Sequence, residues 1–282
     1  MTRERFETNR LLTDGARAVT FPDVTMAKRV FITGSSEGLG LMAGRQLTEE
    51  GHVVVLHARN EARAKTARLA LPQAAAVLVG DVSTLAAMRD VTDQANRWGR
   101  FDAVIHNVGM GYQEPRRVET VDGLSQLWAV NVLAPYVLTV LMQRPDRLVY
   151  LSSGMHTGGD SSLDDPQWSG RRWSGSQAYS DTKLHDVLLA FGVARRWPGV
   201  PSNAVSPGWV ATRMGGAGAP DDLDQGHRTQ AWLAVSDDPG AQVTGAYLYH
   251  QRPKEVNPAA QDPKLQDRLL DYCREISGVA LP

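Results

Sequence analysis

Tyr179 and Lys183 stand four positions apart in a chain of 282 residues, within a stretch that is predicted to be helical. Side chains four residues apart lie on one face of an α-helix. A free tyrosine titrates near ~10, so it is a poor acid or base at neutral pH. Because a neighbouring ammonium group stabilises a phenolate, this pair predicts proton transfer to a carbonyl oxygen or from an alcohol.

A serine pair stands at a second position where chemistry is expected. Ser153 directly follows residues 147–152, an apolar run that predicts a strand. Open α/β sheets bind ligands at the carboxyl ends of their strands, and a hydroxyl there would hold a substrate oxygen as charge develops on it. Ser152 is adjacent, so position alone does not separate the two serines. The chain has no GxSxG turn and no obvious His and Asp partners for acyl transfer.

A glycine-rich segment, residues 33–40, follows the first predicted strand and precedes a helix. Its glycines would let the backbone turn sharply and approach a pyrophosphate. The helix that follows would offer unpaired N–H groups and the positive end of its dipole. The segment therefore predicts a dinucleotide-binding loop, although its spacing differs from the common GxGxxG fingerprint. The residues assigned to the cofactor here are Gly34, Ser35, Ser36, Gly38, Leu39 and Gly40.

The elements that must position these groups alternate between strands and helices. Short runs rich in β-branched residues predict strands at residues 29–33, 52–58, 75–80, 101–107 and 147–152, with shorter ones inside 202–208 and 245–250. Helical stretches separate them, including a long apolar one at about 124–142 and one at about 177–196. The alternation predicts an α/β fold: a Rossmann-type, doubly wound parallel sheet of about seven strands, with helices on both faces, in a single domain.

Composition excludes several classes of protein. The 30 basic and 31 acidic residues give a formal net charge of −1, so no nucleic-acid partner is expected. No apolar run approaches the ~20 residues of a membrane span. Cys273 is the only cysteine, which agrees with a cytoplasmic location. The seven histidines show no metal-ligand spacing, so no metal site is predicted, and His52 and His57 are interpreted as structural.

Taken in order, these motifs resemble the short-chain dehydrogenase/reductase family over about residues 28–250. The Gly-rich segment is similar to the family's TGxxxGxG loop, and Asn107-Val108-Gly109 is similar to its Asn-Ala-Gly element. Asp81 and Val82 match the residues of the adenine pocket. The resemblance implies that Pro207, Gly208, Val210 and Thr212 belong to a segment that closes over the nicotinamide.

The same resemblance implies a catalytic set and a reaction. Ser153 matches the family's catalytic serine, which is the second of such a pair, and Tyr179 and Lys183 match its Tyr-x-x-x-Lys motif. Lys183 would also hold ribose hydroxyls. Asn131 matches a helix asparagine that orders a water passing protons through Lys183. Hydride transfer at carbon would be the cofactor's own chemistry.

The end of the second predicted strand indicates which cofactor is preferred. An acidic residue there favours NAD, whereas Arg accommodates the extra phosphate of NADP. The chain has Arg59 and Asn60 at this point and no acid. We therefore expect a preference for NADP(H), with NAD(H) as the alternative. Glu37 departs from some NADP-preferring relatives, which carry a base in that loop.

The organisation along the chain has two features outside the common family form. Residues 1–25 are expected to be an N-terminal extension, and residues 26–282 the oxidoreductase domain with a C-terminal closing helix. The long segment from Ser153 to Tyr179 includes a substrate-site insertion, residues 154–178, and resembles the retinol-dehydrogenase-like branch. Its Trp168 and Trp173 are open to two interpretations: a wall for a hydrophobic substrate, or anchors of a self-packed surface loop.

The sequence therefore predicts an NADPH-dependent reductase that acts on a small ketone or aldehyde, or on the corresponding alcohol, and is able to form a homo-oligomer. A nucleotide-sensing module without turnover is the alternative, and the full Ser, Tyr and Lys set argues against it. A sugar epimerase of the extended branch ranks third, because no added substrate domain is evident.

Overall fold

The computed structural model describes residues 26–282, and the predicted extension, residues 1–25, lies outside the described residues. The described part is built around one eight-stranded sheet of order β3-β2-β1-β4-β5-β6-β7-β8. Strands β1 to β7 run parallel, and β8 pairs antiparallel with β7. The strands are β1 Arg29–Ile32, β2 Val53–Ala58, β3 Ala76–Val79, β4 Ala103–His106, β5 Arg147–Leu151, β6 Ser202–Ser206, β7 Tyr247–Tyr249 and β8 Arg252–Pro253.

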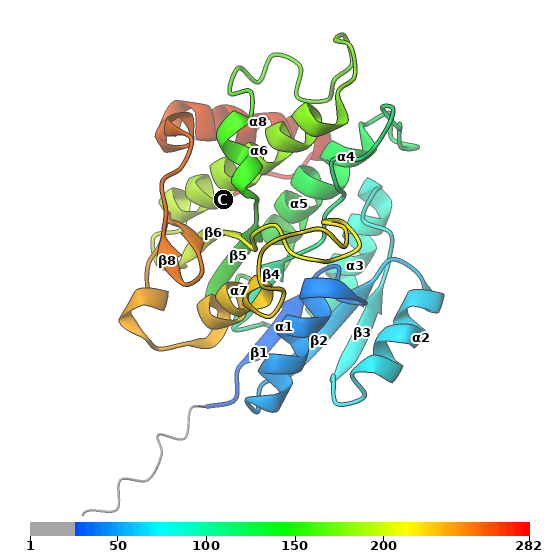
Figure 1. Cartoon of the computed structure of the whole chain (residues 1–282), viewed down its shortest axis with the longest axis vertical. Helices are drawn as coiled ribbons and strands as arrows, with labels where there is room; N and C mark the ends of the chain where they lie inside the picture. The colour runs from blue at the N-terminus through cyan, green and yellow to red at the C-terminus, as the bar shows by residue number, and fades with distance from the viewer. Residues whose placement is uncertain (1–25) are drawn as a thin grey trace, which may run out of the picture.

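Helices cover both faces of the sheet, which confirms the predicted doubly wound α/β fold (Figure 1). One face carries α1 Gly38–Glu49, α2 Glu61–Ala70 and α7 Gln225–Val235. The other carries α3 Leu85–Arg97, α4 Gln126–Trp128, α5 Ala134–Leu141, α6 Gly175–Arg196 and α8 Pro263–Ser277. Because both faces are covered, the strands are nearly continuous apolar runs rather than alternating ones.

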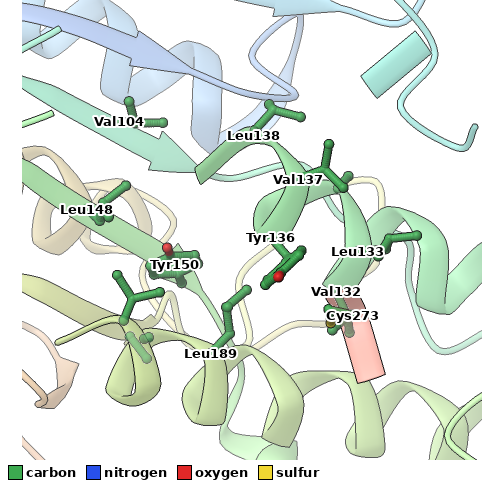
Figure 2. Close-up of a cluster of buried hydrophobic side chains, with 14 of the residues drawn as sticks. Val104, Val132, Leu133, Tyr136, Val137, Leu138, Leu148, Tyr150, Leu189 and Cys273 are labelled. Atoms are coloured by element: carbon green, nitrogen blue, oxygen red, sulfur yellow. The ribbon is translucent and has the colours of Figure 1, made fainter. Parts of the chain in front are cut away.

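The larger hydrophobic core lies between the sheet and the helices α5, α6 and α8, which cover one of its faces. Figure 2 shows Tyr136 of α5 and Tyr150 of β5 packed among aliphatic side chains from neighbouring elements. Cys273 of α8 is buried in the same core. This packing fixes α6 against β5 and β6, and α6 carries the Tyr-Lys pair.

The strand order reverses between β1 and β4, since β2 and β3 lie on one side of this pair and β5 to β7 on the other. In open α/β sheets, ligands bind outside the carboxyl ends of the strands at such a reversal. The loops after β1 and β4 therefore border the expected cofactor cleft.

The long helix predicted at about residues 124–142 is interrupted. A five-residue π-helical turn, Ala129–Leu133, separates α4 from α5. Pro135 lacks an N–H group, so the carbonyl four residues before it, that of Asn131, cannot accept the usual helical hydrogen bond. Such π turns frequently occur at functional sites, and this one contains Asn131.

The sheet has one strand more than the seven predicted. The two-residue β8 follows a turn in which His250 and Gln251 adopt left-handed φ angles of 48° and 61°. Left-handed backbone is uncommon for residues other than glycine, and neither residue type predicts a hairpin from the sequence.

Among the described residues, no helix is long and apolar enough to span a membrane.

Candidate active site

The Gly-rich loop between β1 and α1 approaches the loop after β4 closely. Gly34 has a φ of +61°, and a Cβ atom placed on it would lie 2.7 Å from the Cα of Val108. A Cβ atom on Gly40 would lie 2.5 Å from the Nδ2 of Asn107. The two loops can meet only because both positions lack side chains.

The N-terminus of α1 is suited to a phosphate. Its N-cap, Glu37, makes no side-chain capping hydrogen bond, so within residues 26–282 no N-cap side chain occupies the N–H groups of the first turn. Space is open beside Gly38, where an added Cβ would meet no atom within 4 Å. Free N–H groups and a positive dipole end together form an anion site. The residues present therefore fit the pyrophosphate of a dinucleotide.

His57, at the end of β2, holds the Gly-rich loop in place. Its Nδ1 accepts a hydrogen bond from the N–H of Gly34 at 3.0 Å, and its Nε2 lies 2.9 Å from the carbonyl oxygen of Gly80. The hydroxyl of Ser35 accepts from the N–H of His57 at 2.8 Å. Burial lowers the pKa of the His57 ring, so the neutral form that can both donate and accept is favoured. This agrees with the structural role expected of His57.

The predicted adenine and nicotinamide segments lie along the same edge. Asn107 donates from its Nδ2 to the carbonyls of Thr33 and Gly34, both at 3.0 Å. Asp81 is exposed and accepts a hydrogen bond from Ser83, whereas Val82 is buried. Asp81 thus presents a carboxylate at the end of β3, beside the end of β2.

Charged side chains cluster at the expected adenosine end. Arg59 is exposed directly after β2, and Asn60 caps α2 by accepting from the N–H of Arg63. Arg63 forms an ion pair with Glu37 at 2.5 Å, and Arg213 reaches Glu37 at 3.1 Å from the loop after β6. Burial opposes the charge on Glu37, but its hydrogen bonds to the two arginines lower its pKa overall.

The loop after β6 contains the segment that was predicted to close over the nicotinamide. Gly208 has a φ of +85°, and Val210 is buried and bridges to Asp221. The hydroxyl of Thr212 accepts from the N–H of Gly215 at 3.2 Å. Pro207 packs close to α7, since a Cβ on Gly226 would lie 3.3 Å from its carbonyl oxygen.

The two serines after β5 have different surroundings. Ser152 is buried, and its hydroxyl donates to the carbonyl of Lys183 at 2.7 Å. Ser153 is partly buried, and among the described residues its hydroxyl accepts only from the N–H of Met155, at 3.2 Å. The Ser152 hydroxyl therefore joins β5 to α6, while the Ser153 hydroxyl keeps its own proton to donate.

Tyr179 and Lys183 lie one turn apart on α6, and both are buried. The Nζ of Lys183 is 5.6 Å from the centre of the Tyr179 ring. It donates to the carbonyl of Leu151 at 2.7 Å and to Oδ2 of Asp186 at 2.8 Å. The backbone end of β5 and a carboxylate thus hold the ammonium beside the tyrosine.

Asn131 connects the π turn to α6 and to the loop after β4. Its Nδ2 donates to the hydroxyl of Thr182 at 3.0 Å, and its Oδ1 accepts from the N–H of Met110 at 2.7 Å. A Cβ atom placed on Gly109 would lie 3.6 Å from Oδ1 of Asn131 and 3.7 Å from Nζ of Lys183. Asn131, Gly109 and Lys183 therefore meet at one point.

An apolar cluster surrounds Tyr179. Tyr112 packs edge-on against its ring, with centroids 5.8 Å apart, and Met214 places its sulfur 3.9 Å from the Tyr179 hydroxyl. The remaining members come from the insertion, from the loop after β4, from α4 and from the start of α6: Met110, Leu127, Met155, Trp168, Trp173 and Ala178. A carbonyl compound bound here would contact aromatic and methionine side chains, which adapt readily to irregular apolar shapes.

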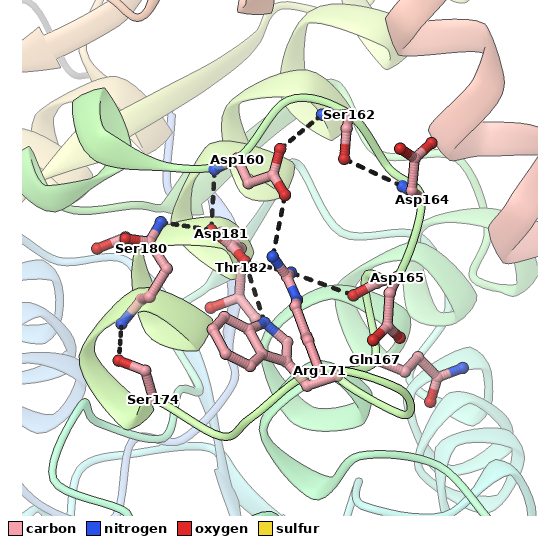
Figure 3. Close-up of polar contacts among 12 residues, drawn as sticks. Asp160, Ser162, Asp164, Asp165, Gln167, Arg171, Ser174, Ser180, Asp181 and Thr182 are labelled. Atoms are coloured by element: carbon pink, nitrogen blue, oxygen red, sulfur yellow. Dashed lines mark hydrogen bonds and ion pairs between the residues drawn. The ribbon is translucent and has the colours of Figure 1, made fainter.

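The insertion is anchored to α6 by Asp181. This residue stands between Tyr179 and Lys183 in the sequence, and its side chain is buried. Asp181 accepts from the indole N–H of Trp168 at 3.0 Å and from Arg171 at 2.8 Å (Figure 3). Arg171 also stacks 3.8 Å from the Trp168 ring centre. Trp173 packs edge-on against Trp168 and donates to the carbonyl of Glu114. Both tryptophans thus make anchoring contacts and also belong to the apolar cluster around Tyr179.

The structure brings the four predicted catalytic residues to the carboxyl ends of β4 and β5 and to α6, and the cofactor residues to the adjoining edge. Three further contributors, Thr182, Asp186 and Met214, were not predicted from the sequence, and His57 was expected to be structural but not to support this loop. Their residue types alone do not indicate the contacts that they make in the folded chain. Within residues 26–282, no cluster of three or more His, Cys, Asp or Glu side chains could hold a metal ion.

Comparisons with known proteins agree with this arrangement. A family model described as short chain dehydrogenase matches residues 28–147. An uncharacterized oxidoreductase of Emericella nidulans, AN7799, is 45% identical over 90% of this chain and 98% of its own. Human retinol dehydrogenase 14 is 29% identical over 92% of this chain and 88% of its own. A crystal structure of an uncharacterized protein from Mycobacterium paratuberculosis has a TM-score of 0.78, with 26% identity over 95% of this chain and 100% of that one.

The identity to the Emericella protein extends along nearly the whole of both chains, so the likeness is not confined to the cofactor loop. The similarity to retinol dehydrogenase 14 confirms the resemblance to that branch, which the long Ser-to-Tyr segment indicated. The chain therefore belongs to the short-chain dehydrogenase/reductase family and is an oxidoreductase of that family.

Proposed function

We propose that the protein reduces a ketone or aldehyde to the alcohol with NADPH, reversibly, and that Tyr179 is the acid-base group. The observation that carries the proposal is the Tyr179–Lys183 pair on α6, with Nζ 5.6 Å from the phenol ring centre and fixed by β5. When bound, NADPH supplies the hydride. The proposal is supported by the name of one relative, human retinol dehydrogenase 14, which denotes a dehydrogenase of an alcohol.

Each catalytic residue has a distinct task in this proposal. Tyr179 donates its phenolic proton to the substrate oxygen in reduction and removes the hydroxyl proton in oxidation. Lys183 stabilises the phenolate by its charge. Ser153 donates a hydrogen bond to the substrate oxygen, for which its free hydroxyl proton suits it better than the engaged hydroxyl of Ser152. Asn131 orders a water that exchanges protons with Lys183.

The cofactor residues form two groups in the same proposal. Gly34, Gly38 and Gly40, with the N-terminus of α1, receive the pyrophosphate. Arg59 receives the 2′-phosphate, because it is exposed at the end of β2 and forms no ion pair within the described residues. The remaining positions carried by the family match are Ser35, Ser36, Leu39, Asn60, Asp81, Val82, Asn107, Val108, Gly109, Pro207, Gly208, Val210 and Thr212.

The substrate in this proposal is a small, largely apolar carbonyl compound. Support comes from the aromatic and methionine side chains around Tyr179. We further propose that the protein works in the cytoplasm, which fits its single buried free thiol, Cys273. Association into homo-oligomers remains part of the proposal.

The test is a screen of NADPH oxidation with ketones, aldehydes and quinones, followed at 340 nm. We expect turnover of at least one apolar carbonyl compound, and a lower KM for apolar than for charged compounds. NADPH binding without turnover across a broad panel would contradict the proposal and favour the sensor module instead. A parallel titration of cofactor binding separates these outcomes.

A further inference from the structure

Lys183 and Asp186 form an ion pair in the interior of the protein. Their charged atoms are 2.8 Å apart, and their side chains are only 5% and 3% exposed. Removing two charges from water is costly unless they pair and make further hydrogen bonds. An acid three residues after a helical lysine usually forms a solvated surface pair; this one is buried beside the proposed acid-base group.

The contacts of Lys183 account for most of its hydrogen-bonding capacity. Its ammonium has three N–H donors: one reaches the carbonyl of Leu151 and another reaches Asp186. Gly109 has no side chain, so room remains between its backbone and Nζ, where an added Cβ would lie 3.7 Å away. One donor is thus left for the reaction, while Asp186 and Leu151 fix the direction of the other two.

The charges around the pair determine what Asp186 does. Burial by itself lowers the pKa of Lys183, but the Asp186 carboxylate and Tyr179 raise it above its ordinary value. Burial raises the pKa of Asp186 to about 6, against the effect of Lys183. In the part of the chain that the structure describes, this carboxylate also acts on Tyr150 of β5, whose pKa burial and Asp186 both raise. At neutral pH the pair is therefore charged.

We propose that Asp186 is a positioning residue of the reaction: its carboxylate keeps Lys183 an ammonium, oriented beside Tyr179. Without that carboxylate, burial favours the neutral amine, and a neutral amine does not stabilise a phenolate. The inference rests on the proposed function, since it concerns the acid-base role of Tyr179. The residue that keeps Lys183 charged would then lie outside the Tyr-x-x-x-Lys motif.

Asp186→Asn tests this, because the amide oxygen can still accept a hydrogen bond from Lys183 but carries no charge. The measurement is the rate of oxidation of 1-phenylethanol, or of the alcohol product found in the screen, with NADP⁺ between pH 6 and 10. An ammonium within about 4–6 Å of an acidic group lowers the pKa of that group by about 1–3 units. We expect the pH of half-maximal rate to rise by at least about one unit, with rates approaching wild type near pH 10. An unshifted pH profile, with or without a uniform loss of rate, would overturn the proposal.

The matched control is His185→Gln, which alters the adjacent buried residue of α6. Neither ring nitrogen of His185 has a hydrogen-bond partner among the described residues. This variant should keep the wild-type pH of half-maximal rate, and a shift equal to that of Asp186→Asn would also overturn the proposal.

A second variant covers the case in which Asp186→Asn does not fold, as judged by circular dichroism. Asp186→Glu retains the charge and moves it by one methylene group, so we expect a lower kcat with the half-maximal pH unchanged. A rise in that pH would contradict the assignment. If the wild-type protein turns over no compound, the proposed function fails and this inference with it; wild-type turnover with an unshifted Asp186→Asn profile defeats this inference alone.

Discussion

Arg59 and Arg63 lie close together at the end of β2 and the start of α2, yet only Arg63 has a carboxylate partner within the described residues. Glu37 engages both Arg63 and Arg213. The extra phosphate of NADPH would therefore meet an uncompensated charge at Arg59 alone. This difference between neighbouring arginines gives the proposed preference for NADP(H) a single-residue basis.

Arg59→Ala should weaken NADPH binding by about 10–100-fold, because a charge-assisted contact contributes roughly 1.5–3 kcal/mol at about 1.4 kcal/mol per decade. NADH binding should change much less, since NADH lacks the 2′-phosphate. Fluorescence titration with both cofactors is the measurement. Arg68→Ala, on the outer surface of α2 and paired with Glu61, is the control and should alter neither affinity. Equal losses for NADPH and NADH would refute the assignment of Arg59.

At this scale the sequence predicts residues in motifs and misses residues that act through tertiary contacts. The residue types and spacings of Tyr179, Lys183 and Gly34 indicate their chemistry from the sequence alone. Those of His57 do not, because its partner Gly80 becomes a neighbour only when the sheet forms. Asp186 stands three residues after Lys183, but the sequence does not show that this pair is buried. The ambiguity between adjacent serines also needs the folded structure, in which one hydroxyl is engaged with α6.

At the scale of elements, the insertion and α6 act as one unit. Asp181 accepts hydrogen bonds from Asp160, Gln177, Trp168 and Arg171, and it is 1% exposed. Trp168 adopts a left-handed φ of 56°, which is costly for a bulky residue, so these contacts must hold it there. The insertion thereby places Trp168 and Trp173 in the cluster around Tyr179.

Asp181→Asn should destabilise the protein by about 1.5–3 kcal/mol, the range for hydrogen bonds to a charged group. It should also raise KM for the carbonyl substrate more than it lowers kcat, because the insertion lines the site without carrying the acid. Urea unfolding and steady-state kinetics measure the two effects. The control is Asp164→Asn in the same insertion, whose side chain is 83% exposed. If the two variants behave alike, Asp181 does not anchor the insertion.

Element boundaries were predictable where buried runs are strongly β-branched, as in β1 and β2. The long apolar helix was predicted without its π turn, because an apolar run does not reveal where one carbonyl loses its donor. Pro135 is the signal that could have located the interruption, four residues after Asn131. The two-residue β8 is too short to carry a period at all.

At the scale of the whole molecule, the described fold is complete as a sheet with both faces covered by helices within residues 26–282. The domain division stays a prediction, which rests on the lack of any recognised cofactor or catalytic motif in residues 1–25. The apolar residues Leu11, Leu12, Val19 and Phe21 are the reason to test it.

A truncated chain that begins at Met26 should keep its melting temperature within a few degrees and its NADPH affinity within about twofold, since unattached termini contribute little. Differential scanning calorimetry and cofactor titration of both lengths provide the comparison. Insoluble protein, or a large fall in melting temperature, would show that the first 25 residues belong to the fold.

We expect buried histidines to make the stability of the whole molecule depend on pH. Burial lowers the pKa of His106 to about 3 and of His185 to about 4. The two histidines take up protons near pH 6.5 in the unfolded chain but not in the folded chain. Their contribution to the free energy of unfolding is therefore complete above about pH 6.5 and is lost as the pH falls. Each should lower the free energy of unfolding by about 1.4 kcal/mol per pH unit between about 6 and 4.

Urea unfolding at pH 7, 6 and 5 measures this slope. His185→Gln should reduce it by the share of one histidine, about 1.4 kcal/mol per pH unit. A slope equal to that of the wild-type protein would mean that His185 is already charged in the folded state.

The central claim is that Tyr179 is the proton donor to a substrate carbonyl, and Tyr179→Phe tests it most directly. The change removes one hydroxyl and keeps the aromatic ring that packs on Tyr112 and the apolar cluster. The measurement is kcat for NADPH oxidation with the carbonyl compound found in the screen, beside a titration of NADPH binding. We predict a loss of about 10²–10⁴-fold in kcat, typical of a removed general acid, with cofactor affinity nearly unchanged. A variant that turns over at close to the wild-type rate would contradict it.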